Sequence, residues 1–195
     1  ALFIKDLSDP NSEIIAVDDN LESEKGILTT DGDRLLIQTN LDAPNQRVVQ
    51  TTIQDPTASS WADLIPETEN VLDANTAGGY IFASYMVDAK DVVMQYDLSG
   101  KKVRDIELPS IGSVYGFGGR ENEDFLYYTF TSFTYPSTIY KYDIPTGTSK
   151  LYKQSEVDFD PEQYETKQVF YTSKDGTEVP MFIVHKKGIK LDGKN

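Results

Sequence analysis

The chain has 195 residues, of which 38% are hydrophobic and 11% aromatic, so it carries enough apolar material for a packed core and is not a disordered segment. Its 32 acidic and 18 basic residues give a formal net charge of -14, which repels phosphate backbones and anionic lipids and excludes nucleic acids and membrane surfaces as partners. It has no cysteine, which excludes disulfides and thiolate metal sites, and no apolar run near the length of about 18 residues that a membrane span needs. We therefore expect a soluble protein, whose compartment, the cytoplasm or a bacterial periplasm, the composition does not distinguish.

A short hydrophobic segment recurs along the chain at nearly constant intervals. Its copies begin at residues 2, 48, 93 and 139, at intervals of 46, 45 and 46 residues. They read LFIKDL (2–7), VVQTTI (48–53), VMQYDL (93–98) and IYKYDI (139–144). The last three close longer blocks of equal length, each of which reads as strand, seven-residue loop and strand: 35–53, 80–98 and 126–144.

Side chains alternate in character within these segments, as they do in a β-strand, where residues two apart share a face. In the last copy Tyr140 and Tyr142 place bulk on one face, and Lys141 places a polar group on the other. The equivalent polar residues of the earlier copies are Gln50 and Gln95. Turn-forming pairs lie between the strand candidates: Asp31-Gly32, Gly78-Gly79, Ser99-Gly100, Gly118-Gly119 and Thr146-Gly147.

The strands that precede these segments, at 35–37 and 80–83, are apolar on both faces, which is typical of strands packed between two sheets. One complete unit then has four strands, near 71–75, 80–85, 92–98 and 102–108. Four short antiparallel strands in a repeat of about 45 residues indicate a β-propeller blade, and a β-sandwich with an accidental period is the alternative. Residues 1–25 then supply the last two strands of one blade, and three further blades follow at 26–68, 71–109 and 112–155.

The repeat ends after Ser155. Where a fifth copy is due, residues 171–176 read YTSKDG, and they follow the acidic, proline-containing stretch EVDFDPEQYE (156–165). The stretch QVFYTSKDGTEVPMFIVHKK (168–187) instead predicts two strands joined by a tight Asp-Gly turn. We therefore divide the chain into three parts: a partial propeller (1–155), a linker (156–167) and the start of a second domain (168–195).

Three stretches carry a family resemblance: TSKDGTEVPMFIVHKKGIKLDGKN (172–195), FTSFTYPSTIYKYD (130–143) and WADLIPE (61–67). They resemble the prolyl oligopeptidases, also called prolyl endopeptidases, a family of serine peptidases. The resemblance covers essentially the whole chain and is most specific at 170–188. It implies an all-β partial β-propeller of about three and a half four-stranded blades from a seven-bladed ring. It also implies that the closing hairpin is the first β-hairpin of a truncated α/β-hydrolase domain.

The function that the resemblance implies is hydrolysis of short peptides after proline by a Ser-His-Asp triad. The nucleophile of such a triad belongs on a G-x-S-x-G-like turn, and no such segment occurs here. The single histidine, His185, lies ahead of the positions where the triad of the family comes. We therefore expect part of a proline-specific serine endopeptidase whose propeller filters substrates by size. In this piece we expect no catalytic, cofactor-binding or metal-binding residue, no cofactor, and short proline-containing peptides as the partners of the parent protein.

His185 invites a catalytic or metal-binding interpretation, but no second histidine or cysteine is available to complete a metal site. We interpret it as a surface residue of a strand. The glycine-rich residues 116–120 (GFGGR) resemble a phosphate loop, yet they precede the strand candidate FLYYTF rather than a helix whose N-terminus would hold an anion. We interpret this stretch as a turn of a blade.

Acidic residues gather at several places without a pattern that indicates catalysis or calcium binding. One run lacks the glycine-containing loop and terminal glutamate of an EF-hand, and we interpret it as a solvated linker: Glu156, Asp158, Asp160 and Glu162. Two pairs lie in predicted turns without the apolar pocket that raises the pKa of a catalytic acid, and we place them on the surface: Asp18 with Asp19, and Asp31 with Asp33.

Aromatic residues are concentrated in the block 126–142, where they alternate along a strand. Such a stripe can stack on a ligand, but alternating aromatics in a strand more often fill the space between two sheets, and we assign them to the core. We interpret Trp61, in or just before the fourth strand of its blade, as a packing anchor.

Two other functions stay open on the sequence. The chain is alternatively a non-catalytic β-propeller that binds a protein or a ligand, since a propeller does not determine a function. An acyl-peptide or dipeptidyl hydrolase relative has the same architecture, but is not expected to match 170–188 so closely. A G-x-S-x-G segment beyond residue 195 distinguishes the peptidase from the scaffold. Uncovered blade faces at both ends of the array further predict self-association.

Overall fold

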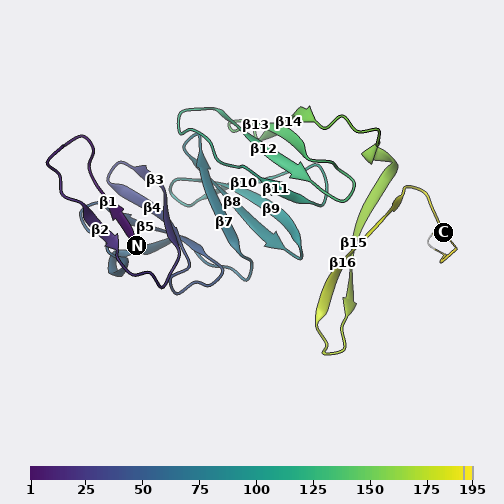
Figure 1. Cartoon of the computed structure of the whole chain (residues 1–195), viewed down its shortest axis with the longest axis horizontal. Helices are drawn as coiled ribbons and strands as arrows, with labels where there is room; N and C mark the ends of the chain where they lie inside the picture. Colours follow the sequence, from purple (N-terminus) through teal and green to yellow (C-terminus); the bar gives the residue numbers. More distant parts are fainter. Residues whose placement is uncertain (191, 195) are drawn as a thin grey trace.

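Residues 1–190 and 192–194 are described by a computed structural model, in which they form four successive antiparallel sheets and a terminal hairpin (Figure 1). Sheet 1 is β1 (Leu2–Ile4) and β2 (Ile15–Asp18). Sheet 2 is β3 (Lys25–Asp31), β4 (Arg34–Thr39), β5 (Arg47–Thr52) and β6 (Ala62–Ile65), with the short 3-10 helix η1 (Ala58–Ser60) before β6.

The later sheets repeat this arrangement. Sheet 3 is β7 (Leu72–Ala77), β8 (Tyr80–Val87), β9 (Lys90–Asp97) and β10 (Lys102–Ile106). Sheet 4 is β11 (Ser113–Tyr115), β12 (Phe125–Thr131), β13 (Thr138–Asp143) and β14 (Thr148–Gln154). The terminal hairpin is β15 (Tyr164–Thr172) and β16 (Glu178–Lys186), preceded by the 3-10 helix η2 (Pro161–Gln163).

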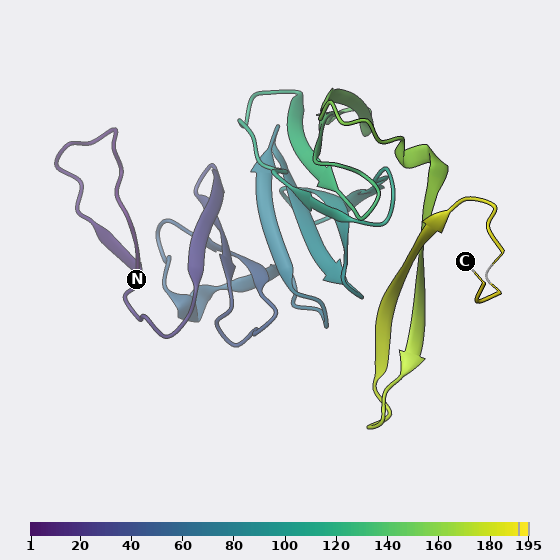
Figure 2. The ribbon, with the colours of Figure 1, turned by 45° about the vertical axis from the view of Figure 1, so that its right-hand side comes forward.

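Each of sheets 2, 3 and 4 is a simple meander, in which every strand pairs with the strand that follows it in the sequence. The sheets stand next to one another in chain order, with the terminal hairpin beyond sheet 4 (Figures 1 and 2). Four-stranded meanders arranged in series are blades of a β-propeller. The prediction of an all-β partial propeller is confirmed, and the four-stranded sheets lie within the predicted blades 26–68, 71–109 and 112–155, except that β3 begins one residue earlier.

The core consists of three apolar layers, one between each pair of neighbouring sheets. Strand β4 contributes to two of these layers, because Leu35 and Ile37 face sheet 1 while Leu36 faces sheet 3, and all three are at most 2% exposed. The third layer, between sheets 3 and 4, is mainly aromatic, with Phe117 stacked on Tyr128 at 4.6 Å between ring centroids. Burial of each side chain of this size stabilises the folded state by about 1.5–3 kcal/mol.

The buried polar residue Gln95 joins sheets 3 and 4 within the aromatic layer. It is fully buried, although the alternation of side chains in its strand places it on the polar face. The Tyr142 hydroxyl donates to Gln95 Oε1 at 2.7 Å, and Gln95 Nε2 donates to the Ile144 carbonyl oxygen at 3.4 Å. Burial raises the pKa of Tyr142 to about 12, so its hydroxyl stays protonated and donates this bond.

One predicted loop is wrong. Seven residues do separate β4 from β5 and six separate β12 from β13, but β8 and β9 pair as far as Val87 and Lys90 and are joined by a two-residue turn. Asp88 and Ala89 form this turn with φ values of 51° and 61°, the left-handed conformations of a type I′ hairpin turn. Such turns favour asparagine and glycine, so an Asp-Ala pair gave no turn signal in the sequence.

The terminal hairpin is longer than the sequence suggested. Strand β15 begins at Tyr164, so the last four residues of the predicted linker 156–167 are paired with β16, from Tyr164 with Lys186 to Lys167 with Ile183. Backbone hydrogen bonds between the two strands, rather than a hydrophobic pattern, decide this boundary. Among the residues that the structure describes, no helix is long and apolar enough to cross a membrane.

Two glycines occupy equivalent turns in different surroundings. Gly32 lies between β3 and β4 with φ +58°, and Gly78 lies between β7 and β8 with φ +57°. A Cβ atom at Gly32 meets nothing within 4 Å, whereas one at Gly78 lies 2.6 Å from the Glu123 carbonyl oxygen and 2.7 Å from Cδ1 of Ile144. The turn at Gly78 therefore lies directly against sheet 4.

Gly78→Ala is expected to destabilise the protein more than Gly32→Ala. Both substitutions impose a left-handed conformation on alanine, at a cost of about 1 kcal/mol. Only Gly78→Ala adds steric overlap with sheet 4, which costs about 1–3 kcal/mol more. Urea unfolding followed by circular dichroism measures both; equal losses of stability in the two variants contradict the packing of this turn against sheet 4.

Tyr142→Phe is expected to lower the free energy of unfolding by about 1–2 kcal/mol, because it leaves the buried Gln95 side chain without its donor. Tyr127→Phe is the control, since Tyr127 is 39% exposed, and a change within about 0.5 kcal/mol is expected there. Thermal and urea unfolding of both variants test the hydrogen bond between Tyr142 and Gln95. An unchanged free energy of unfolding in Tyr142→Phe contradicts a stabilising role of this hydroxyl.

Candidate functional site

His185 is on β16 directly opposite Glu165 of β15, so the two side chains share one face of the hairpin. The histidine side chain is only 6% exposed, and its Nδ1 lies 2.9 Å from the Lys186 carbonyl oxygen and 3.4 Å from Glu165 Oε1. Its Nε2 is buried without a hydrogen-bond partner. The prediction of a surface residue is wrong, because the ring packs back on the main chain at Lys186 instead of extending into solvent.

This histidine does not form part of a recognisable catalytic or metal centre in the described chain. A histidine base acts on a nucleophile that is within hydrogen-bond reach, and Nε2 contacts no hydroxyl. Among the residues that the structure describes, no three or more His, Cys, Asp or Glu side chains come together as ligands for a metal ion.

The acidic run before the hairpin has structural contacts at its end. Glu156 and Asp158 are exposed, as a linker residue is. Asp160 caps η2, since its Oδ1 accepts a hydrogen bond from the Glu162 backbone nitrogen at 3.0 Å. The Tyr135 hydroxyl donates to Glu162 Oε1 at 2.5 Å, which lowers the pKa of Glu162 and raises the pKa of Tyr135 to about 12. The run is therefore a connection between the propeller and the hairpin, with no cation-binding arrangement.

The glycine-rich residues 116–120 form a loop that attaches sheet 4 to sheet 3. The Gly119 backbone nitrogen donates to the Thr76 carbonyl oxygen at 3.0 Å, and the Arg120 carbonyl oxygen accepts from the Gly78 backbone nitrogen at 2.9 Å. Both bonds are between main-chain atoms of different sheets. The Gly119 N–H, a donor of the kind that a phosphate loop offers to an anion, is thus used within the propeller.

The tyrosine-rich block divides between core and surface. Tyr128 and Tyr142 are at most 1% exposed, as predicted for residues that fill the space between sheets, and burial raises the pKa of Tyr128. Tyr127, on the opposite face of β12, is 39% exposed and lies 4.7 Å from the ring of Tyr152 on β14. The outer face of sheet 4 therefore presents aromatic side chains.

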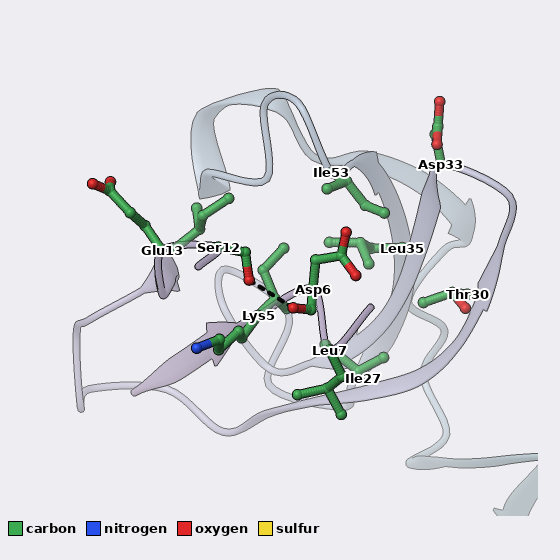
Figure 3. Close-up of a pocket in the computed structure, with 12 residues that line it drawn as sticks. Lys5, Asp6, Leu7, Ser12, Glu13, Ile27, Thr30, Asp33, Leu35 and Ile53 are labelled. Carbon is green, nitrogen blue, oxygen red and sulfur yellow. Dashed lines mark hydrogen bonds between the residues drawn. The ribbon is translucent and has the colours of Figure 1, made fainter. Parts of the chain in front are cut away.

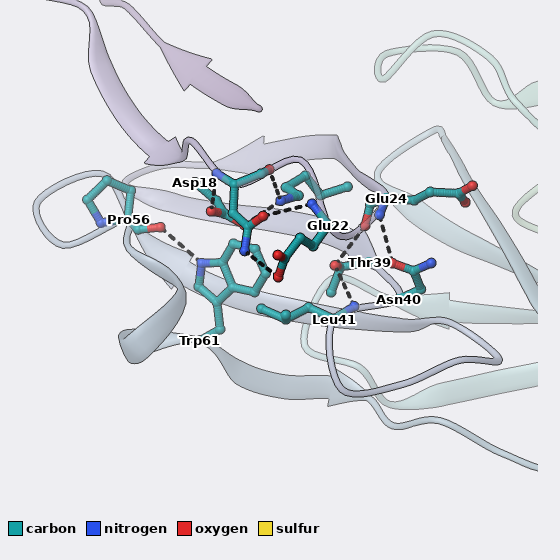
Figure 4. A network of polar contacts seen from close by, with 10 residues as sticks. Asp18, Glu22, Glu24, Thr39, Asn40, Leu41, Pro56 and Trp61 are labelled. Carbon is teal, nitrogen blue, oxygen red and sulfur yellow. Dashed lines mark hydrogen bonds and ion pairs between the residues drawn. The ribbon is translucent and has the colours of Figure 1, made fainter.

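A polar network surrounds the loop between sheets 1 and 2 (Figure 4). The predicted surface acid Asp18 forms an ion pair with Lys25, whose side chain is 2% exposed, and this pair lowers the pKa of Asp18. Lys25 also donates to the Asn20 carbonyl oxygen at 2.7 Å. Trp61 donates from its indole nitrogen to the Pro56 carbonyl oxygen at 2.9 Å and packs on the first core layer, which confirms its role as a packing anchor.

A cavity of 710 Å³ lies between sheets 1 and 2 (Figure 3). Its floor is apolar and includes Leu35 and Ile53, while Asp6, Glu13 and Asp33 lie around it. The Ser8 hydroxyl and backbone nitrogen hold the carboxylate of Asp6 and lower its pKa. A carboxyl group with a lowered pKa stays charged at neutral pH, so Asp6 does not act as a proton donor there.

The side chains that join the propeller to the hairpin carry no signal in the sequence. Gln168 Nε2 of β15 donates to the Asp88 carbonyl oxygen at 2.6 Å, and the Phe182 ring of β16 lies 5.5 Å from the ring of Phe133. The residues of each pair are far apart in the chain and belong to no motif. No periodic signal marks such contacts, because only the folded arrangement brings them together.

The chain matches the model of the prolyl oligopeptidase N-terminal β-propeller domain over residues 1–155. It is 51% identical over 194 residues to a prolyl endopeptidase of Elizabethkingia meningoseptica, a match that covers 100% of this chain and 27% of that protein. Prolyl oligopeptidase B from Galerina marginata, solved as the apo protein, superposes with a TM-score of 0.86 at 28% identity and covers 98% of this chain and 28% of its own. The same protein bound to a 25mer macrocyclization substrate superposes with a TM-score of 0.75 at 29% identity, covering 93% and 26%.

The chain thus spans about a quarter of the length of the relatives that it matches. The resemblance carried by residues 61–67, 130–143 and 172–195 agrees with these matches, which extend over nearly the whole chain. Three observations agree: the sheets are four-stranded meanders in series, residues 1–155 match the model of the propeller domain, and 51% of 194 aligned residues are identical to a prolyl endopeptidase. The chain therefore belongs to the prolyl oligopeptidase family.

Proposed function

We propose that the chain is part of a proline-specific serine endopeptidase that hydrolyses short peptides after proline. The observation that carries this proposal is the 51% identity, over 194 residues, to a protein named prolyl endopeptidase. The peptide substrate bound to the Galerina relative supports peptides as the partners. The finer preference for short, proline-containing peptides rests on the family resemblance.

Within that enzyme, the described sheets act as a wall that restricts access to the catalytic centre and contribute no reacting group. The buried Nε2 of His185 has no nucleophile beside it, and the acidic side chains near the hairpin are exposed or used in structural contacts. A Ser-His-Asp triad requires a serine, its base and an orienting carboxylate in mutual hydrogen-bond contact. We assign these three residues to the part of the protein outside this chain.

We further propose that the propeller ends at residue 155 and that the terminal hairpin begins the hydrolase domain. The family match to the propeller domain stops at residue 155, which supports the first boundary. The hairpin strands pair only with each other in the described chain, which supports a separate unit. Residues 156–163 then form the linker, four residues shorter than the sequence suggested.

The 195-residue chain alone is expected to release no product from a chromogenic proline anilide. The protein encoded by the whole gene is expected to cleave the same substrate and to lose this activity after a serine-directed inhibitor. Hydrolysis by the isolated chain, in a preparation free of other peptidases, contradicts the assignment of the triad to the rest of the protein. A gene without a G-x-S-x-G segment beyond residue 195 favours the binding scaffold instead.

We also propose that the isolated chain self-associates through the outer faces of its first and last sheets. Sheet 4 exposes Tyr127 by 39% and Tyr152 by 62% on its outer face, and sheet 1 exposes Phe3 by 51%. The equivalent faces inside the array are covered by the neighbouring sheet. Apolar patches of this kind mark surfaces that are covered by another chain or by another part of the protein.

Light scattering of the purified chain is expected to show a mass above 21.9 kDa that rises with concentration. The variant Tyr127→Lys with Tyr152→Glu places charge on the outer face of sheet 4 and is expected to shift the mass toward the monomer. Lys174→Glu, at an exposed position in the turn of the terminal hairpin, is the control for charge alone. A monomer with a cooperative melt at every concentration excludes self-association.

A further inference from the structure

A groove of 460 Å³ lies between sheets 3 and 4. One wall is the segment that follows β10, with Glu107, Leu108 and Pro109, and the opposite wall is the start of β14, with Thr148 and Ser149. The two walls belong to four-stranded sheets whose strands are all described, so both walls are complete. The volume lies within the range of about 300–1,000 Å³ that is typical of ligand sites.

The floor of the groove is the end of a column of stacked aromatic rings. Phe117 stacks on Tyr128 at 4.6 Å between ring centroids, and Tyr128 stacks on Tyr140 at 5.4 Å. Tyr128 is buried, whereas Tyr140, the last ring of the column, is partly exposed and lines the groove. Leu151 is directly opposite Tyr140 on β14 and is 58% exposed. A ring of a ligand therefore finds an apolar surface on which to stack.

Two polar groups that line the groove have no partner among the residues that the structure describes: the Tyr140 hydroxyl and the Glu107 carboxylate. Burial and the charge of Glu162 raise the pKa of Tyr140, so its hydroxyl keeps its proton and can donate a hydrogen bond. The other tyrosine of the floor is already paired, because the Tyr128 hydroxyl donates to the Ser149 hydroxyl at 3.0 Å. The groove thus offers a ligand one free donor and one free carboxylate.

The charges beside the groove favour a cationic ligand. Glu107 is exposed, and the whole chain carries a formal net charge of -14. One cation, Arg104, lies against Gly147 of the groove, and its Nη2 donates to the Pro145 carbonyl oxygen at 3.0 Å. Within the described chain Arg104 forms no ion pair with Glu107, so this carboxylate is left for a positive group from outside.

A polyproline II segment with a basic residue matches these features. In that conformation the backbone carbonyl groups have no internal hydrogen bonds, so they accept from a donor such as the Tyr140 hydroxyl. Proline rings pack on aromatic side chains in the grooves that recognise such segments, and the fixed conformation of the segment lowers the entropic cost of binding. An arginine beside the prolines supplies the planar cation that pairs with a carboxylate such as Glu107.

We propose that the groove between sheets 3 and 4 binds a proline-rich peptide segment that carries an arginine. Tyr140 and Leu151 pack on the proline rings, the Tyr140 hydroxyl donates to a peptide carbonyl oxygen, and Glu107 pairs with the arginine. This binding site is independent of the proposed peptidase function, because every residue that forms it lies within residues 107–151 and takes part in binding only.

Binding of blocked peptides to the 195-residue chain is measured by saturation-transfer nuclear magnetic resonance, which detects weak ligands. The probe is a run of prolines followed by one arginine. One matched peptide replaces the arginine by citrulline, which keeps the shape without the charge, and another replaces the prolines by alanines. The probe is expected to bind about fivefold more tightly than either matched peptide.

Two variants each remove one polar group of the groove. Glu107→Gln and Tyr140→Phe are expected to weaken binding of the probe about fivefold. Glu156→Gln and Tyr171→Phe change the same residue types at exposed positions elsewhere, and are expected to leave the affinity unchanged. Thermal unfolding checks that each variant is folded. Because Glu107 is exposed, Glu107→Gln keeps the test decisive if Tyr140→Phe does not fold.

The absence of saturation transfer from the probe overturns the proposal, as does equal affinity for the citrulline or the alanine peptide. Equal affinity of the groove variants and their controls also overturns it, because the peptide then binds elsewhere. A groove variant that lowers the mass in light scattering without weakening peptide binding assigns the groove to a second copy of the chain, which again contradicts the proposal.

Discussion

The stability of each inner sheet depends on its neighbours, because an inner sheet has two apolar faces and cannot bury either of them by itself. Leu36 of sheet 2 is buried only because sheet 3 stands beside it, and Leu35 on the other face is buried by sheet 1. A single four-stranded meander with such faces would expose both to water, so stability increases with the number of neighbours.

Stacking alone allows two sheets to slide past one another, and directional bonds prevent this. Between sheets 3 and 4, the backbone of Gly119 bonds to Thr76, and the buried Gln95 bonds to Tyr142. Hydrogen bonds in an apolar layer are costly to leave unpaired, so they select a single register between the sheets. The same requirement explains why the glycine at 78 lies against sheet 4 while the equivalent turn at Gly32 is open.

The function that we propose for this arrangement is mechanical rather than chemical. The sheets form a wall, and the terminal hairpin is attached to that wall through an exposed segment and a few surface contacts. In the peptidase that we propose, of which this chain is about a quarter, such a wall restricts which substrates reach the reacting groups.

The sequence by itself determined the blades, because a period of about 45 residues and the alternation along each strand come from local chemistry that every copy repeats. It also determined the family, through local stretches such as 172–195. The tertiary structure alone decided the burial of Gln95 and His185, the two-residue turn at Asp88 and the partner of Glu162. Each of these depends on a neighbour distant in the chain or on a backbone conformation that its residue type does not favour, and neither leaves a periodic trace in the order of residues.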